Sequence, residues 1–319
     1  MRRRAFTLVE LLAVIGILVA LATITAISVQ RVSKDTRLTK AANDLLNVLE
    51  TARGVAIRTH QPVMVAFRAR TERFDQVSND PMKYPNPARI KRQWTEAVVG
   101  RLEEPMQRRD PSLDLSKQVF IDRFVPEPGI PGFAFPEGVK VAGSFAGFGN
   151  ELYDRAWVTQ PKLNENTALE EAGSVIGVIF DANGRVVSRL EGSGIASISQ
   201  GRYPVMDFNR NGVQDIINES AGASQGHIQD QEGDEPNVVT TQLLALFDDR
   251  ICREMYDEKN WIGTAFPVWS ITKPCSQLGT SQTRKICEQS EFIEQFGTRI
   301  AFNRNTGRAE VMQIGRAHV

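Results

Sequence analysis

The amino-terminal segment constrains this chain more than any other part. Residues 1–27 place three arginines before an apolar run of roughly 22 residues, which a single acid, Glu10, interrupts. A run of that length is long enough to span a membrane, and the arginines favour a cytoplasmic amino end. Near mid-membrane an ionised Glu10 costs on the order of 2.5–3.5 kcal/mol, so it needs a partner or a purpose. An ordinary secretory signal fits poorly because its apolar region is shorter.

Residues 5–12, AFTLVELL, resemble the signal of type IV prepilins and pseudopilins. The resemblance implies that a prepilin peptidase cuts between Ala5 and Phe6 and that the new amino terminus of Phe6 is N-methylated. It also implies that Glu10 neutralises the amine of Phe6 on a neighbouring subunit during assembly. The chain departs from the family in having Ala5 where Gly is usual. The alternative is a signal anchor whose Glu10 reaches back to the membrane interface.

Behind the apolar run the helical pattern becomes one-sided. Apolar residues recur at i, i+3, i+4 and i+7 over 38–56, which predicts an amphipathic helix. We therefore expect one continuous helix, transmembrane over 6–27 and amphipathic over 28–58. Residues 60–62, His-Gln-Pro, end it because Pro disfavours helix in the residue before it.

The rest of the chain has the composition of short strands joined by turns. The turns at 181–184 and 303–307 each predict a hairpin, because Asn and Gly accept the positive φ that a tight hairpin needs. Runs rich in β-branched and aromatic residues predict strands at 63–67, 118–124, 139–141, 174–180, 185–190, 195–199, 241–247, 298–302 and 309–313.

Three later segments resemble particular subgroups of this family. Residues 45–67, 135–141 and 178–185 are similar to H-type minor pseudopilins and T-type minor fimbrial pilins. The expected fold class is therefore α+β and pilin-like: a long N-terminal transmembrane and amphipathic helix packed on an antiparallel β-sheet domain with large loop insertions. We expect those insertions at 68–117 and 219–236.

The last six residues, IGRAHV, coincide with one reading frame of a common sequencing adapter, and we expect them to be foreign to the protein. A natural tail is the alternative. The expected divisions are a leader peptide at 1–5, the N-terminal helix at 6–58, an extracytoplasmic β-rich pilin-like domain at 59–313 and the adapter-derived tail at 314–319.

Composition argues against several other functions. Lys plus Arg and Asp plus Glu each number 38, so no overall basic field draws in nucleic acid. With His318 in the suspect tail, two histidines remain, His60 and His227, and two give little basis for a His-based triad or metal site. The neighbouring acids Asp248 and Asp249 would point to opposite faces of a strand. We therefore expect that this protein is not an enzyme.

The three cysteines all lie late in the chain, in the part expected on the side of the membrane where disulfides persist. Cys275 and Cys287 would close a short loop and leave Cys252 unpaired. The other pairings stay open, because connectivity does not follow from sequence.

One block has the spacing of a calcium loop. Oxygen-bearing side chains alternate in it, Gly at the sixth position permits a sharp turn, and one backbone carbonyl completes the pattern. The expected ligands are Asp207, Asn209, Asn211, Val213 and Asp215. The twelfth position carries no acid, so a simple Asn-Gly turn is the alternative. We expect no required cofactor, with structural calcium as an option at this loop.

Together these features predict a minor pseudopilin or pilin that a prepilin peptidase processes and that assembles through its helix into a type II secretion pseudopilus or a type IV pilus. The expected partners are prepilin peptidase, other pilins or pseudopilins in a filament, and the inner membrane, with no nucleic acid. The expected location is a single pass in the bacterial inner membrane, amino end cytoplasmic and domain periplasmic. Alternatives are a DNA-binding minor pilin, with 89–92 as its short basic segment, or a membrane-anchored carbohydrate-binding or hydrolytic domain.

Overall fold

The computed structural model divides the chain into two compact units, Met1–Lys40 and Ala41–Val319. The structure describes residues 8–73, 90–107, 120–144, 157–160, 175–187, 204–208, 210, 212, 238–261, 274–277, 279, 282–303 and 305–312.

The long helix α1 (Leu8–Thr59) contributes its first part to one unit and its last part to the other. From Ala41 onward it buries small and apolar side chains at helical spacing. His60 then adopts a left-handed backbone at φ 54°, and Pro62 follows, so the helix ends where the sequence predicts. The buried side chains of this part are Ala41, Ala42, Leu45, Leu49, Ala52, Val55 and Ala56.

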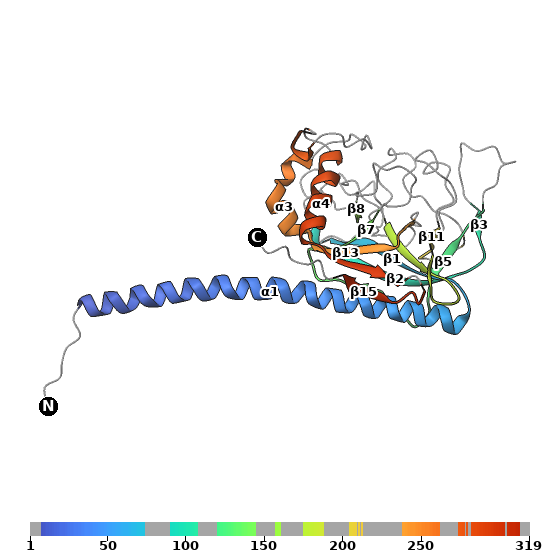
Figure 1. Cartoon of the computed structure of the whole chain (residues 1–319), viewed down its shortest axis with the longest axis horizontal. Coiled ribbons are helices and arrows are strands. Elements are labelled where there is room, and N and C mark those ends of the chain that lie inside the picture. Colours follow the sequence, from blue (N-terminus) through green and yellow to red (C-terminus); the bar gives the residue numbers. More distant parts are fainter. Residues whose placement is uncertain are drawn as a thin grey trace, which may run out of the picture. The chain divides into compact units, whose positions relative to one another are not determined.

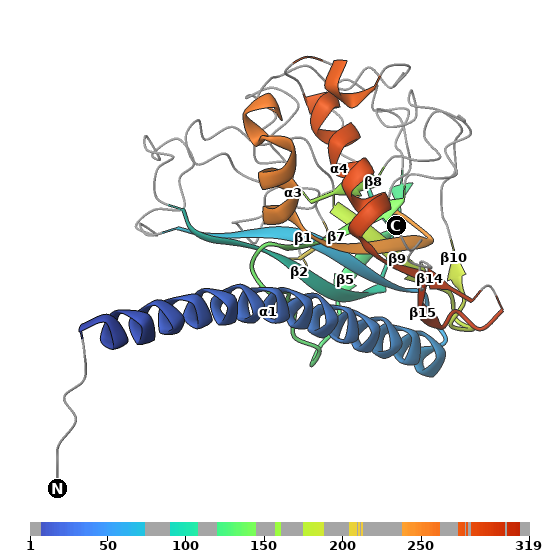
Figure 2. The same cartoon turned by 60° about the vertical axis from the view of Figure 1, so that its left-hand side comes forward.

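Within the second unit, residues 41–59 of α1 lie along the side of the sheets opposite to the helices α3 (Asp249–Tyr256) and α4 (Gln282–Phe296), as both views show (Figures 1 and 2). Two short 3-10 turns, η4 (Glu258–Trp261) and η5 (Cys275–Gln277), lie close to α4. The sequence predicted neither α3 nor α4, although Ile286 and Ile293, seven residues apart, follow a helical spacing.

The first sheet has β1 (Val63–Arg73) near its centre, and its described strands follow the order β10-β9-β1-β2-β5-β11. β1 pairs antiparallel with β2 over almost its full length, from Val63 opposite Arg101 to Arg73 opposite Ile90. The other strands of this sheet are β2 (Ile90–Leu102), β5 (Arg123–Pro126), β6 (Phe133–Ala134), β9 (Val175–Phe180), β10 (Val186–Val187), β11 (Val205–Met206) and β12 (Val238–Thr240).

The second sheet is antiparallel, with the order β15-β14-β13-β7-β8. Edge-to-face rings of Phe180 in β9 and Phe302 in β14, 6.1 Å apart between centroids, join it to the first sheet. Its strands are β7 (Val139–Ser144), β8 (Trp157–Thr159), β13 (Leu243–Asp248), β14 (Thr298–Phe302) and β15 (Ala309–Met312), and a separate pair is β3 (Met106–Gln107) with β4 (Phe120–Ile121).

Both predicted hairpins are present, and their turns meet. The turn between β9 and β10 contains Gly184 at φ 74°, and the turn between β14 and β15 contains Gly307 at φ 69°. A β-carbon on Gly307 would collide with the carbonyl oxygen of Gly184. Arg53 of α1 donates a hydrogen bond from Nε to the Thr306 carbonyl at 2.7 Å, so the helix is tied to this turn-to-turn contact.

The predicted fold class is wrong in its architecture. Strands and helices are both present, so α+β agrees only in part. The structure is dominated by two main sheets rather than one antiparallel sheet, and the first of them is mixed, because β11 pairs parallel with β5 and β12 pairs parallel with β9. Parallel neighbours need long crossover connections, and each of these two pairs joins strands that lie far apart in the sequence. The predicted insertion at 68–117 is also partly strand.

The predicted transmembrane segment at 6–27, the pilin-like arrangement around it and the single-pass inner-membrane location are also wrong. Among the residues that the structure describes, none of the helices combines the length and the apolar character needed to cross a bilayer. The described side chains of α1 lie mostly at 36–59, where charged residues recur and most of the apolar side chains are buried.

Candidate functional site

The structure describes only part of the predicted assembly segment. Glu10 belongs to α1 by its backbone, whereas Ala5 and Phe6 lie outside the described residues. Further along α1, four large apolar side chains are 49–61% exposed in the isolated chain: Leu12, Ile15, Ile17 and Leu18. Large apolar side chains exposed on one helix are typical of a surface that contacts another molecule.

The predicted calcium loop is built around Asp207, whose side chain is fully buried. Its Oδ1 accepts a hydrogen bond from the backbone N–H of Arg210 at 2.6 Å, and its Oδ2 accepts one from the N–H of Gly212 at 3.1 Å. Arg123 Nε also donates to Oδ2 at 2.6 Å. Arg210 and Gly212 have φ of 63° and 74°, so the carboxylate holds a tight turn together.

Asp207 therefore already faces one cation, the Arg123 guanidinium. The other expected ligands, Asn209, Asn211, Val213 and Asp215, lie outside the described residues. Calcium at this loop stays a prediction: a bound ion requires the melting temperature to fall when a chelator is added. No shift, together with no bound ion in a calcium titration, would remove it.

The neighbouring acids Asp248 and Asp249 have separate structural roles. Asp248 ends β13 and caps α3, accepting hydrogen bonds from the backbone N–H groups of Arg250 and Ile251. Asp249 begins α3 and is buried.

Asp249 is the centre of a buried polar network that the sequence did not reveal. Its Oδ2 lies 2.7 Å from Arg253 Nε and 3.5 Å from Lys140 Nζ, and its Oδ1 accepts from Gln289 Nε2 at 3.1 Å. Lys140 also donates to the carbonyl of Gln160 at 3.0 Å. Because this acid holds β7, α3 and α4 together, its role is in packing. The spacing of Asp249 and Arg253, four residues apart on one helix, is the part of this network that a short stretch of sequence reveals.

The single free cysteine of the described chain, Cys252, lies in the same region and is fully buried. Burial raises the pKa of its thiol far above the ordinary range, and the neighbouring negative charge of Asp249 adds to the effect. A thiol kept protonated in this way is a weak nucleophile.

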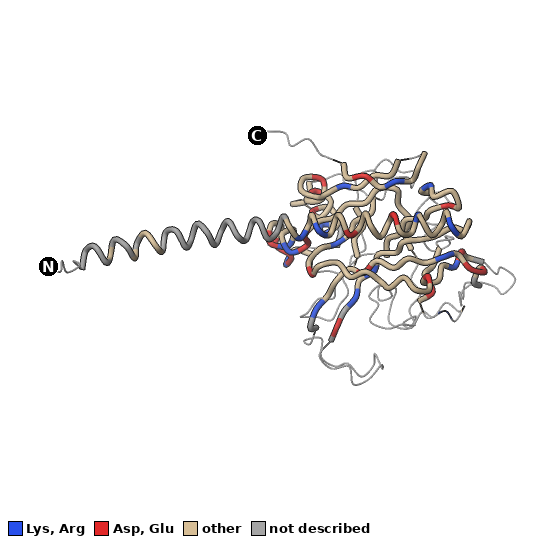
Figure 3. Tube along the Cα trace, turned by 90° about the horizontal axis from the view of Figure 1, so that it is seen from below, with Lys and Arg blue, Asp and Glu red and all other residues tan. Residues whose placement is uncertain are grey.

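In the basic segment considered for DNA binding, 89–92, Arg92 is the basic residue whose side chain the structure describes, and it is paired with an acid. Arg92 Nε lies 2.6 Å from Glu72 Oε2 across the β1–β2 ladder, and its guanidinium stacks on Trp94 at 4.5 Å. In the same ladder Arg68 Nε lies 2.6 Å from Glu96 Oε2. Along the traced chain, Lys and Arg alternate with Asp and Glu rather than gathering in one patch (Figure 3). His60 is exposed at the end of α1, and His227 lies outside the described residues.

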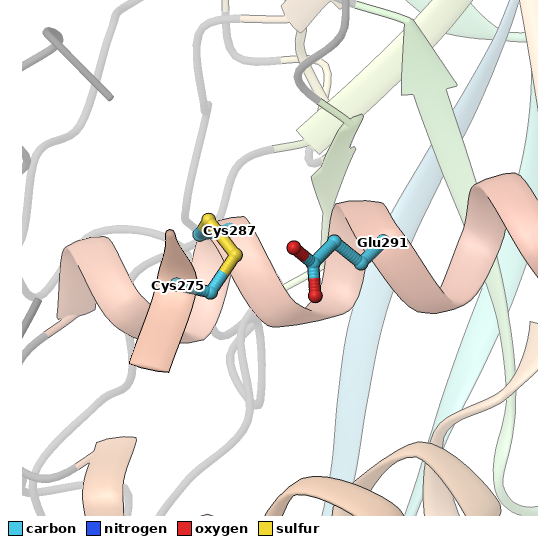
Figure 4. Close-up of side chains that lie close together, drawn as sticks. All are labelled: Cys275, Cys287 and Glu291. Carbon is cyan, nitrogen blue, oxygen red and sulfur yellow. A yellow bond between two sulfur atoms is a disulfide. The ribbon is translucent and has the colours of Figure 1, made fainter. Parts of the chain in front are cut away.

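A disulfide joins Cys275 in η5 to Cys287 in α4, with their Cα atoms 5.6 Å apart. The carboxylate of Glu291, one turn further along α4, extends toward it (Figure 4). The two sulfur atoms and one carboxylate oxygen all lie within 4.8 Å of one another. Sequence reasoning singled out the two cysteines but missed Glu291, although its i+4 spacing from Cys287 was a readable signal.

Comparisons with protein-family models, with curated proteins and with solved structures found no match to this chain.

Proposed function

We propose that this protein is a minor pseudopilin or pilin subunit, which a prepilin peptidase processes and which assembles through α1 into a type II secretion pseudopilus or a type IV pilus. The observation that carries the proposal is the segment 5–12, AFTLVELL, in which a small residue precedes Phe6 and an acid follows at Glu10. Trimming at Ala5 would free the amine of Phe6, and N-methylation would follow there.

The exposed apolar side chains of α1 support assembly through this helix. Leu12, Ile15, Ile17 and Leu18 are 49–61% exposed in the isolated chain. Burying one such side chain fully contributes roughly 1.5–3 kcal/mol, so lateral packing of several copies of the helix would be favourable. From Ala41 onward the apolar face of α1 is already buried in its own chain, which leaves the earlier part of the helix for other subunits.

Glu10 would supply register in such a packing. A charge buried between apolar helices is costly unless an opposite charge meets it. The free amine of Phe6 on a neighbouring subunit is such a charge, and only one stagger of the helices brings the two groups together. Other staggers would leave both groups unpaired, which disfavours them.

The alternatives have no comparable support. Arg92 and Arg68 each face an acid and an aromatic ring, so neither of these two supports a binding strip for a nucleic acid backbone. No observation on the described residues favours a carbohydrate-binding or hydrolytic domain.

The test is to co-express the full chain with a prepilin peptidase and a major pilin or pseudopilin, and to compare wild type with Glu10→Ala. We expect mass spectrometry to find Phe6, N-methylated, at the amino terminus of both proteins. Only the wild type should appear in the sheared filament fraction.

Glu50→Ala is the matched control, because Glu50 lies on the same helix and pairs with Arg53 within its own chain. It should enter filaments as well as wild type does. Equal incorporation of Glu10→Ala would refute the register role, and a purified protein that still begins with its arginines would refute the processing.

A further inference from the structure

Three potential metal ligands come together where η5 meets α4. Cys287 and Glu291 are four residues apart on α4 and therefore share one face of the helix. Cys275 in η5 lies against that face, so the two sulfur atoms and a carboxylate oxygen are mutually within 4.8 Å (Figure 4). In the oxidised chain the sulfur atoms are bonded to each other and offer no thiolate.

We propose that reduction of this disulfide converts the cluster into a zinc site with Cys275, Cys287 and Glu291 as ligands. The proposal is independent of the filament function. The disulfide would then be a redox gate: the oxidised protein binds no zinc here, and the reduced protein binds one Zn²⁺.

The chemistry balances with a dithiol as the reductant. The dithiol gives up two electrons and two protons and becomes a disulfide, while the Cys275–Cys287 bond breaks and each sulfur takes one proton. Zn²⁺ then displaces both protons, because the thiolate is the form that binds metal. Two thiolates and one carboxylate leave the fourth tetrahedral position to water.

The geometry suits this ligand set. Zn–S bonds of about 2.3 Å in a tetrahedral site place two sulfur atoms roughly 3.8 Å apart. The sulfur atoms need to separate by only about 2 Å from bonding distance to reach that value. In the oxidised chain all three donor atoms already lie within 4.8 Å of one another, and the zinc site needs no larger separation between them.

The surroundings also suit a ligand role. Cys275 and Cys287 are buried, at 4% and 7% exposure, whereas Glu291 is exposed. The cysteines are thus shielded while the acid leaves a path for the ion from solvent. The hydrogen bonds and ion pairs observed among the described residues do not engage the Glu291 carboxylate, so turning it to a metal breaks none of these contacts. Its charge does raise the pKa of Tyr256, after the larger effect of burial.

The test uses the purified full chain, oxidised or reduced with a phosphine that carries no thiol and is then removed without air. Thiol titration first verifies that the disulfide has opened. Zn²⁺ binding is measured by competition with a chromogenic chelator, and Co²⁺ replaces Zn²⁺ to give a thiolate charge-transfer band. We expect one Zn²⁺ per reduced chain, none per oxidised chain, and the Co²⁺ band in the reduced chain only.

Variants distinguish the three ligands from the remaining thiol. Glu291→Gln leaves the disulfide intact and should lower the zinc affinity of the reduced chain at least about tenfold. Cys287→Ser should abolish binding, whereas Cys252→Ala should keep it. Equal zinc binding before and after reduction, unchanged affinity in Glu291→Gln, or a disulfide that stays closed under millimolar reductant would each overturn the proposal.

Discussion

Replacing Asp249 with Ala should destabilise the second unit severely, because this acid is the shared partner of two buried cations. Arg253 Nε and Lys140 Nζ lie 2.7 and 3.5 Å from its Oδ2, and both side chains are at most 10% exposed. Gln289 would lose its acceptor as well. Removing one partner of a buried ion pair costs about 3–5 kcal/mol, since an uncompensated charge remains in the interior.

Partial compensation places the expected loss toward the lower end of that range. Arg253 keeps Glu258 at 2.8 Å, and Lys140 keeps the Gln160 carbonyl at 3.0 Å. Asp249→Asn should cost less than Asp249→Ala, because the amide retains the size of the side chain and an oxygen that accepts hydrogen bonds. Adding Lys140→Met to Asp249→Ala should recover part of the loss, because one stranded cation is removed.

The assay is denaturant unfolding with the disulfide intact, followed by tryptophan fluorescence. Trp157 and Trp261 both belong to the core that α3 and α4 cover, so their emission reports on this region. Glu254→Ala, an exposed position on α3, is the matched control and should stay within about 0.5 kcal/mol of wild type. A loss below about 1 kcal/mol for Asp249→Ala would refute the argument that the network is buried and mutually dependent.

Three further predictions follow from single positions. Gly54→Ala should raise the free energy of unfolding by about 0.5–1 kcal/mol, because Gly54 is a solvent-exposed residue in the middle of a helix and a β-carbon there meets nothing within 4 Å. Destabilisation in the same assay would contradict this. Gly307→Ala should cost about 1–3 kcal/mol from its left-handed backbone alone and more from the collision with Gly184, so a wild-type melting temperature would rule out the turn-to-turn contact. Burial raises the pKa of Cys252 in the folded chain. Above the ordinary thiol pKa of about 8.5, the unfolded chain loses this proton while the folded chain keeps it. The free energy of unfolding should therefore fall by about 1.4 kcal/mol per pH unit in that range. An unfolding series against pH should show that slope in wild type and lack it in Cys252→Ala.

Local features of the fold were predictable from the sequence. The strand Thr298–Phe302 has the predicted bounds, and the hairpin turns at 181–184 and 303–307 form where Asn and Gly predicted them. The end of α1 near Pro62 is equally local. Each of these depends on backbone preferences of a few consecutive residues.

The largest miss in the sheets, β2, shows why the rest was not predictable. Its charged residues looked like those of a solvated loop, yet Arg92 pairs with Glu72 and Glu96 pairs with Arg68 across the ladder. Charges neutralised by a neighbouring strand are compatible with a sheet, but the neighbour is not visible in the strand's own sequence. The parallel strands β11 and β12 were missed because each is only two or three residues long and pairs with a strand far away in the sequence.

The sequence by itself determined the motif at 5–12, the end of the helix and the turns, because these depend on side chains and backbone angles within a few residues. Only the tertiary structure decided that Asp249 meets Lys140 and Gln289, and that Glu291 faces the Cys275–Cys287 disulfide. Contacts of this kind join residues from separate elements. Their formation depends on how the whole chain closes its loops and buries its apolar surface, which no short stretch of sequence encodes.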